Sequence, residues 1–107
     1  IGVTTMTEKY IELEHPGVLL QEDFLDDLGI KPGTLAGSIG VDRTAIKNII
    51  GGKRATTADM SLRLGLFLNM STGFWFNLQK DYELRIAQRE NLAKFEKVVP
   101  PFRAANL

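Results

Sequence analysis

The segment from Pro32 to Arg54, PGTLAGSIGVDRTAIKNIIGGKR, restricts the fold of this chain more than any other stretch, because its small and apolar residues suit two short helices joined by a tight turn. A helix that opens at the proline places Leu35, Ala36 and Ile39 on one face. Gly40 ends that helix, because glycine adopts a positive φ without steric cost. Ala36 is small, as a close crossing by the second helix requires. The pattern predicts a helix-turn-helix.

The second helix of this motif follows a short turn. Val41 fills the gap between the two helices, and Asp42 is placed to cap the free N–H groups of the second one. Ile46, Ile49 and Ile50 recur at helical spacing and form its predicted buried stripe.

The opposite face of this second helix is polar and small. Its residues lie at i, i+3, i+4 and i+7, with an arginine beside them: Thr44, Lys47, Asn48 and Gly51, with Arg43. Lysine and arginine donate to guanine, asparagine pairs with adenine, and threonine contacts a thymine methyl or donates its hydroxyl. We therefore predict that Arg43, Thr44, Lys47 and Asn48 read bases in the major groove of DNA. A solvated polar face without a ligand is the alternative.

The loop after the motif is rich in glycine and basic residues. Glycines let a backbone approach a phosphate closely, and cations beside them neutralise its charge. Either Thr56, in a T-x-x-D pattern with Asp59, or Thr57 caps the helix that follows, predicted from Ala58 to Leu68 with Met60, Leu64 and Leu68 inward. The residues predicted to hold the DNA backbone are Thr34, Lys53, Arg54 and Thr57. A loop that only contributes to solubility is the alternative.

Four stretches of the chain, in this order, resemble one family. They are HPGVLLQEDFLDDLGI, LAGSIGV, GGKRATTADMSLRLG and FWFNLQKDYELRIA, which together run from His15 to Ala87. The combination is similar to the HigA-type, or VapI-like, addiction-module antitoxins of the lambda-repressor-like DNA-binding class. The most specific pieces are HPG, the GKRAxTAD run and the FWxNLQ string.

The resemblance implies an all-α, five-helix DNA-binding domain that represses its own operon at a near-palindromic operator. It also implies that the protein is a type II antitoxin, which neutralises a HigB-like mRNA-cleaving toxin. Val18 stands where the family usually has glutamate, and Lys31 and Pro32 stand where it has a Ser-Gln pair. Because that glutamine commonly contacts the DNA backbone, its loss favours the alternative, a protein-interaction scaffold of the same fold without specific DNA binding.

The remaining pattern predicts one domain between two ends of different character. Residues 1–14 show no helical period and are expected to form an arm, residues 15–92 the helix-turn-helix domain, and residues 93–107 a C-terminal tail. Within the domain, a first helix is expected over 16–28, with Leu19, Leu20, Phe24 and Leu28 buried and Gly29 as its stop. A last helix is expected over 72–90, capped by Ser71. Prolines at 100 and 101 leave the tail either a short edge strand or a disordered end.

The last predicted helix carries more apolar surface than a small core covers. Aromatic residues at helical spacing are most often core residues, but tryptophan and tyrosine are also enriched at subunit interfaces. The predicted interface of a homodimer consists of Phe74, Trp75, Phe76 and Tyr82. Such a dimer would present its reading helices to major grooves about 34 Å apart.

Composition narrows the function further. Cysteine is absent and there is one histidine, His15, which is expected to act as a helix-entry residue, not as a metal ligand or general base. No metal site, cofactor or catalytic set is expected, so an enzyme is disfavoured. No apolar run approaches a membrane span, and the N-terminal stretch lacks the features of a signal peptide. A cytoplasmic protein is expected.

The charge is zero overall but unevenly distributed. Residues 1–30 carry one lysine against seven carboxylates, a net charge of −6, whereas residues 31–63 carry six cations against two carboxylates, a net charge of +4. The motif is therefore the basic part, as phosphate binding requires. The first helix presents Glu22, Asp23, Asp26 and Asp27, which form either a plain solvated face or, with the N-terminal arm, a docking surface for a basic toxin.

Overall fold

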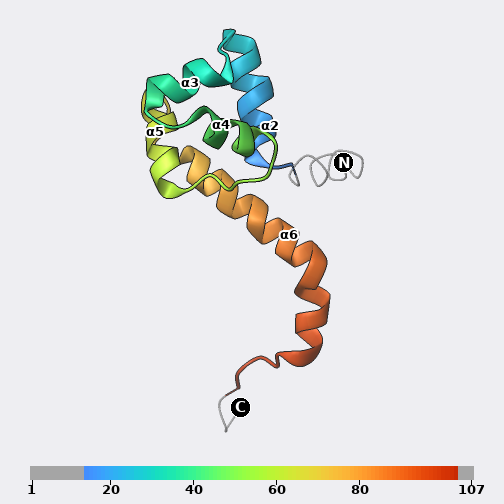
Figure 1. Cartoon of the computed structure of the whole chain (residues 1–107). Helices are drawn as coiled ribbons and strands as arrows, with labels where there is room; N and C mark the ends of the chain where they lie inside the picture. Colours follow the sequence, from blue (N-terminus) through green and yellow to red (C-terminus); the bar gives the residue numbers. More distant parts are fainter. Residues whose placement is uncertain (1–13, 104–107) are drawn as a thin grey trace, which may run out of the picture.

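The computed structural model describes residues 14–103, and every regular element in that range is helical. Helix α2 (Pro16–Leu19) continues directly into the π-helix η1 (Leu20–Asp26), and four α-helices follow (Figure 1). These are α3 (Pro32–Ile39), α4 (Arg43–Ile50), α5 (Ala58–Leu68) and α6 (Phe74–Val98). With α2 and η1 counted as one, the described chain has five helices, which confirms the predicted all-α class.

The hydrophobic core is built around Trp75, the largest side chain that is completely buried. Phe24 and Phe74 meet its ring edge-on, with centroid separations of 5.3 and 5.2 Å, a favourable geometry for aromatic pairs. All helices contribute to this core, whose fully or almost fully buried aliphatic residues are Leu20, Leu25, Leu35, Ile46, Ile49 and Leu64. Because α3 and α4 bury their apolar stripes here, the core fixes the helix-turn-helix.

The first helix differs from its predicted form. Leu28, expected in the buried stripe, is 59% exposed, whereas Leu25 is buried. The cause is the π-helical turn over 20–26, because i→i+5 hydrogen bonding widens each turn and brings residues five apart onto one face. Leu20 and Leu25 have that spacing. The apolar period of a regular α-helix was therefore the wrong one here.

The helix-turn-helix follows its prediction closely. Leu35, Ala36 and Ile39 are buried, and Gly40 caps α3 in the left-handed region with φ of 75°. Ile46 and Ile49 are buried and Ile50 is half-buried. Asp42 occupies the N-cap position of α4, but its side chain makes no capping hydrogen bond there.

Gly17 sets how closely α2 approaches α4. A Cβ atom on this glycine would lie 1.8 Å from the carbonyl oxygen of Ile49 and 2.9 Å from Cα of Ile50. No side chain fits in that space, since real carbon atoms do not approach so closely. The glycine of the HPG string therefore lets the first helix pack directly on the backbone of α4.

The last two helices confirm one predicted start and correct another. Helix α5 spans the predicted residues, with the Thr57 hydroxyl accepting a hydrogen bond from Met60 N at 3.2 Å and Asn69 ending it at φ of 57°. Met60 and Leu64 are buried, while Leu68 is only half-buried. Helix α6 begins at Phe74, not Thr72, and Gly73 takes its N-cap position in place of Ser71. The hydroxyl of Ser71 instead accepts from Gly73 N in the preceding turn.

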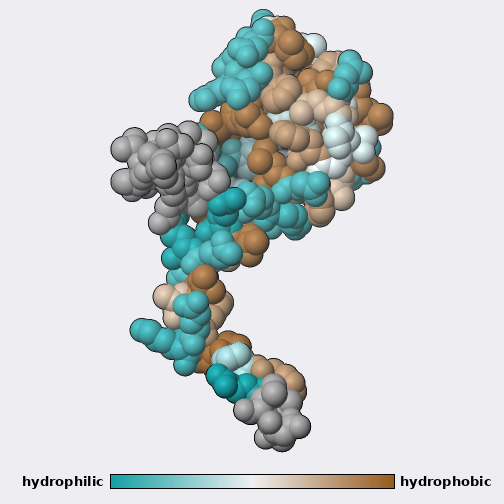
Figure 2. All heavy atoms as spheres, turned by 180° about the vertical axis from the view of Figure 1, so that it is seen from behind, coloured by the Kyte–Doolittle hydropathy of each residue, from teal (hydrophilic) through white to brown (hydrophobic). Residues whose placement is uncertain are grey.

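Helix α6 also runs farther than expected. It continues to Val98, so the predicted domain boundary after residue 92 falls inside an unbroken helix. Its second half leaves the helical body, and this extends the molecule to 60 × 34 × 23 Å (Figure 1). The space-filling view shows apolar residues along this projecting part (Figure 2). The predicted arm, residues 1–14, lies outside the described residues apart from Glu14.

Candidate nucleic-acid interface

The four predicted base-reading residues lie on one side of α4, opposite the residues that anchor it. Ala45, Ile46 and Ile49 are buried against the core. The other side leaves three reading residues exposed and one half-buried: Arg43, Thr44 and Lys47, and Asn48. The structure thus brings the predicted set together, and Asn48 is the member with the least free surface.

The cations around α4 have no carboxylate partner within the described residues. The ion pairs between Glu14 and Arg103 join Arg63, Lys80, Arg85 and Arg89 to carboxylates, all of them on α5 or α6. No such pair is present there for Arg43, Lys47, Lys53 or Arg54. Positive charge that is not neutralised inside a protein attracts a polyanion most strongly, and this is the charge pattern that phosphate binding uses.

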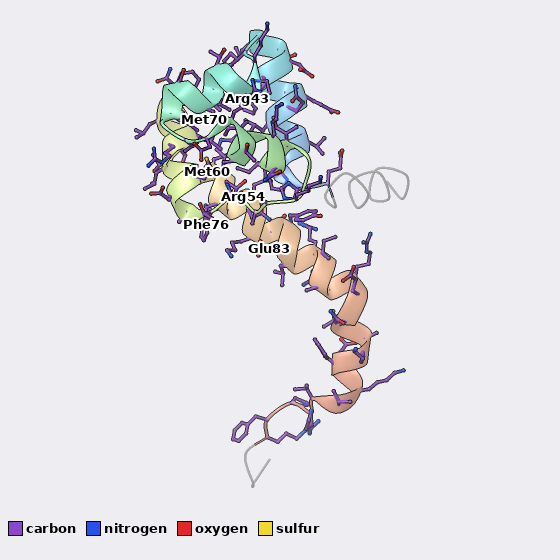
Figure 3. All side chains as sticks on the ribbon, in the orientation of Figure 1. Arg43, Arg54, Met60, Met70, Phe76 and Glu83 are labelled. Atoms are coloured by element: carbon purple, nitrogen blue, oxygen red, sulfur yellow. The ribbon has the colours of Figure 1, made fainter. Side chains whose placement is uncertain are left out.

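A groove separates the start of α3 from the start of α4. It has a volume of about 730 Å³ and is bordered by Lys31, Thr34, Arg43 and Lys47. The Arg43 side chain lies against Gly33, where a Cβ atom would come within 3.0 Å of its Cδ. Gly33 therefore leaves room for this arginine, which Figure 3 shows beside α3.

The residues predicted to hold the DNA backbone come from three segments around α4. Thr34 is exposed in α3, and Lys53 and Arg54 are exposed in the loop after α4 (Figure 3). This loop is held by its own backbone, because Asn48 O accepts from Lys53 N at 2.8 Å and from Arg54 N at 3.2 Å. Thr57 is exposed at the N-terminus of α5, whose free N–H groups suit an anion.

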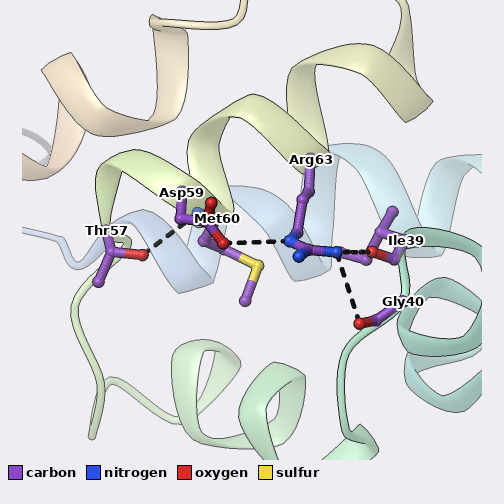
Figure 4. A network of polar contacts seen from close by, with 6 residues as sticks. All are labelled: Ile39, Gly40, Thr57, Asp59, Met60 and Arg63. Carbon is purple, nitrogen blue, oxygen red and sulfur yellow. Dashed lines mark hydrogen bonds and ion pairs between the residues drawn. The ribbon is translucent and has the colours of Figure 1, made fainter.

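Arg63 has a role that its contribution to the basic charge of the motif did not reveal. Its Nη1 donates to the carbonyl of Ile39 at 2.6 Å and to that of Gly40 at 3.5 Å, and its Nε pairs with Asp59 at 3.2 Å (Figure 4). The last carbonyls of a helix lack partners within the helix, so a cation there stabilises its C-terminus. Arg63 thereby links α5 to the turn of the helix-turn-helix.

Two buried polar residues also position the interface, and sequence reasoning assigned neither a role. Gln79 accepts a hydrogen bond from Thr56 N at 2.9 Å and donates to Glu83 at 3.0 Å. Ser61 donates to the carbonyl of Thr72 at 2.7 Å and accepts from Phe76 N at 2.9 Å. Gln79 therefore holds the segment after the basic loop against α6, and Ser61 joins α5 to the start of α6.

The predicted dimer residues mostly contact their own chain. Trp75 is completely buried, so its prediction as an interface residue is wrong: it has no surface to offer a second subunit. Phe76 is half-buried beneath the Lys80 ammonium, 5.2 Å from its ring centre, and Tyr82 meets the His15 ring at 5.3 Å. Phe74 packs on Trp75. For Phe74, Phe76 and Tyr82 the interface role stays a prediction.

His15 is the N-cap of α2, as the expected helix-entry role requires. Its Nδ1 accepts a hydrogen bond from Gly17 N at 2.9 Å. Burial lowers the pKa of His15, and the Arg54 carbonyl and Glu83 oppose this shift without overcoming it. No group of three or more metal-binding side chains is found in residues 14–103. No helix in this range is long and apolar enough to cross a membrane.

Together, the helix-turn-helix core, the exposed polar face of α4 and the unpaired cations around it define the class of helix-turn-helix DNA-binding proteins. No family model matches the chain. It is 33% identical to virulence-associated protein I of Dichelobacter nodosus over 71% of this chain and 70% of that protein. It is 42% identical to virulence-associated protein A′ of the same organism over 65% of this chain and 61% of that protein.

A solved structure is similar over almost its whole length. The antitoxin HigA of Pseudomonas aeruginosa, solved with the higBA promoter, is 34% identical, with a TM-score of 0.80 over 84% of this chain and 98% of that one. The chain therefore belongs to the HigA and VapI family of helix-turn-helix antitoxins.

Proposed function

We propose that this protein is the antitoxin of a type II toxin–antitoxin module and represses its own operon by binding operator DNA through α4. The observation that carries the proposal is the polar face of α4, where Arg43 and Lys47 are exposed without a carboxylate partner in the described chain. The promoter-bound HigA relative supports it, because the two chains share sequence and fold over almost the whole of that protein.

In this proposal the contacts divide into two kinds. Arg43, Thr44, Lys47 and Asn48 enter the major groove and read base edges. Thr34, Lys53, Arg54 and Thr57 lie on the segments around α4 and hold the phosphates, which fixes the register without reading sequence. The groove between α3 and α4 gives the phosphate backbone a place beside Lys31 and Arg43, in the absence of the family's usual glutamine.

The test replaces Lys47 and Asn48 by alanine, singly and together. Binding would be measured by fluorescence anisotropy at two salt concentrations, against the duplex upstream of the coding region and a scrambled duplex of equal length. Each good base contact contributes about 1–3 kcal/mol, so each substitution should weaken native-duplex binding by roughly one to two orders of magnitude and reduce the preference for it.

The matched control is Lys97→Ala, which removes a cation from the far end of α6. It should leave both duplexes bound as before. If Lys47→Ala and Asn48→Ala also change nothing, the reading role of α4 is wrong, and a protein-interaction scaffold of the same fold becomes the better account.

The protein is further proposed to act as a homodimer on a near-palindromic operator. Two-fold symmetry of the protein matches two-fold symmetry of the site, with half-sites one helical turn, about 34 Å, or a multiple apart. Hydroxyl-radical footprinting would measure the spacing. A single protected half-site at saturation would contradict a dimer on DNA.

The partner proposed for the acidic side of the molecule is a basic, HigB-like mRNA-cleaving toxin. A groove of about 290 Å³ runs between α2 and α6, with Val18, Leu19, Leu78 and Tyr82 lining its apolar part. Four carboxylates also line it: Glu14, Glu22, Asp23 and Asp81. An apolar groove edged by negative charge suits a basic segment with an apolar anchor.

Reversing the charge of Glu22 and Asp23 to lysine tests this surface. Toxin binding should weaken strongly while operator binding is kept, because both residues are exposed on the helix opposite α6 in the groove, away from the face of α4. Asp27→Lys, on the same helix but outside the groove, is the control. Full inhibition of the toxin by the Glu22→Lys, Asp23→Lys variant would rule the groove out.

The protein is also proposed to have no catalytic activity and no cofactor, and to act in the cytoplasm. The family relatives reported above are named as antitoxins and virulence-associated proteins, which supports a binding role. Turnover in a nuclease assay, with a chelator control, would overturn this part of the proposal.

A further inference from the structure

The second half of α6 exposes a stripe of large apolar side chains. Leu84 is 57% exposed, Leu92 47%, Phe95 50% and Val98 68%. They lie on the part of the helix that projects from the body, where Figure 2 shows apolar residues between polar ones. A monomeric soluble protein rarely leaves such a contiguous stripe in water.

These residues share one side of the helix. At about 100° per residue, the four side chains fall within an arc of roughly 120°, with Gln88 and Asn91 between them. The residues that pack on the body, Trp75, Leu78 and Gln79, lie on a different side of α6, about 130° away on the same wheel. The apolar face thus changes sides near Leu84, so the stripe does not continue the core.

We propose that this stripe, Leu84, Leu92, Phe95 and Val98, binds the same stripe of a second copy of the chain in an antiparallel helix pair that crosses near Asn91. In that arrangement Leu84 of one copy meets Val98 of the other. Asn91 lies close to its own symmetry mate, where paired amides can hydrogen-bond and fix the register of two helices.

Charges beside the stripe favour this occupant and this direction. Arg85 and Glu96 lie on the same edge, about 16 Å apart along the helix, so they do not meet within one copy. An antiparallel pair crossing near Asn91 brings Arg85 of each copy to Glu96 of the other, twice by symmetry, whereas a parallel pair does not. Residues 84–98 carry four cations against two carboxylates, and this net positive charge disfavours the basic toxin as occupant.

This inference refines the homodimer of the proposed function but needs no DNA to be tested. It moves the main contact from the predicted Phe74, Phe76 and Tyr82 to the distal half of α6. It also makes this helix the element that sets the distance between the two reading heads.

Because the chain contains no cysteine, single engineered thiols report the geometry directly. Asn91→Cys should form a disulfide-linked dimer on mild oxidation, whereas Leu84→Cys should not, because the two thiols would lie about 21 Å apart. A mixture of Leu84→Cys and Val98→Cys proteins should give a cross-linked heterodimer. Cross-linking by both single variants would indicate a parallel pair and overturn the proposal, and so would cross-linking by neither.

Sedimentation of the full chain tests the energetics. The Leu92→Glu, Phe95→Glu double variant should raise the dimer dissociation constant at least about tenfold, because buried apolar anchors carry most of the binding energy of an interface. Leu66→Glu, at an apolar residue of α5 that is 72% exposed, is the control and should leave the dimer intact. If Phe76→Glu breaks the dimer and the distal variant does not, the predicted proximal interface is correct and this proposal is wrong.

The two proposals fail in different ways. If the distal variant is a folded monomer by circular dichroism and still binds a single half-site weakly, the DNA-reading role stands and the dimer contact is established. If the wild type is a cross-linked dimer that binds no operator, the dimer contact stands and the proposed repressor function fails.

Discussion

Arg63 and Lys47 are both long cations on the surface of the helix-turn-helix half of the molecule, but only one of them is used inside it. Arg63 donates to the carbonyls that end α3 and pairs with Asp59. Lys47 has no carboxylate partner between Glu14 and Arg103. The difference teaches that residue type and charge do not reveal a cation's role here. The partners that the fold provides do.

The same contrast separates two sets of polar residues. An inner set, Ser61, Arg63 and Gln79, spends its hydrogen bonds on backbone groups that join helices. An outer set, Arg43, Thr44 and Lys47, points away from the core of α4. Changes in the inner framework should therefore alter the free energy of unfolding, and changes in the outer set should alter ligand binding.

The strongest test of the framework is Gly17→Ala. The new methyl group would lie 1.8 Å from the carbonyl oxygen of Ile49, and neither backbone can move without disturbing the core. Overpacking costs about 1–3 kcal/mol, and this contact belongs at the upper end, so urea unfolding should show a loss of about 3 kcal/mol. Operator binding should also weaken, because α2 packs directly against α4.

Gly37→Ala is its matched control. Gly37 lies inside α3, and a Cβ atom there would meet nothing within 4 Å. Because alanine is a better helix former than glycine, this variant should gain about 0.5–1 kcal/mol. Similar losses from both glycine variants would show that the helices are not held as closely as the structure has them.

The second test compares the two cations directly, through Arg63→Met and Lys47→Met. Loss of the charged hydrogen bonds to the end of α3 should cost about 1.5 kcal/mol of unfolding free energy, near the low end because the arginine is partly exposed. Lys47→Met should stay within about 0.5 kcal/mol of the wild type. Equal destabilisation by the two would remove the distinction drawn here, and urea unfolding of both variants decides it.

Much of the fold follows from local sequence rules. The helix-turn-helix, the glycine at its turn and the bounds of α5 were predicted correctly, because small residues, caps and apolar spacing act over a few positions. The π-helical turn in the first helix was not, since a period of five depends on how that helix packs against its neighbours. The predicted burial of Leu28 failed for that reason.

The candidate site shows the same limit. The reading residues could be placed on one face of α4 from spacing alone, and the structure groups them there. The supporting bonds of Gln79 and Arg63 could not be found, because each spans more than twenty residues of sequence. Trp75 was assigned to an interface partly because an aromatic cluster gives no sign of which ring points inward. The FWxNLQ string was the only available signal for Gln79.

The smallest expected effect concerns His15, which belongs to the inner set through the hydrogen bond that its Nδ1 accepts from Gly17 N. Burial lowers its folded-state pKa below the ordinary 6.5, so folding favours the neutral ring. The stabilisation is complete above the unfolded-state pKa and is lost as the pH falls through 6.5 to the folded-state value. Protonation at Nδ1 would also remove the acceptor that caps α2.

This pH dependence can be isolated because the chain has no other histidine. Unfolding free energy measured between pH 7.5 and 5 should decline for the wild type by less than the Arg63→Met effect. His15→Asn keeps a capping oxygen but cannot be protonated in this range, so its curve should stay flat. A wild-type curve that rises as the pH falls would mean that Glu83 and the Arg54 carbonyl outweigh burial and favour the charged ring.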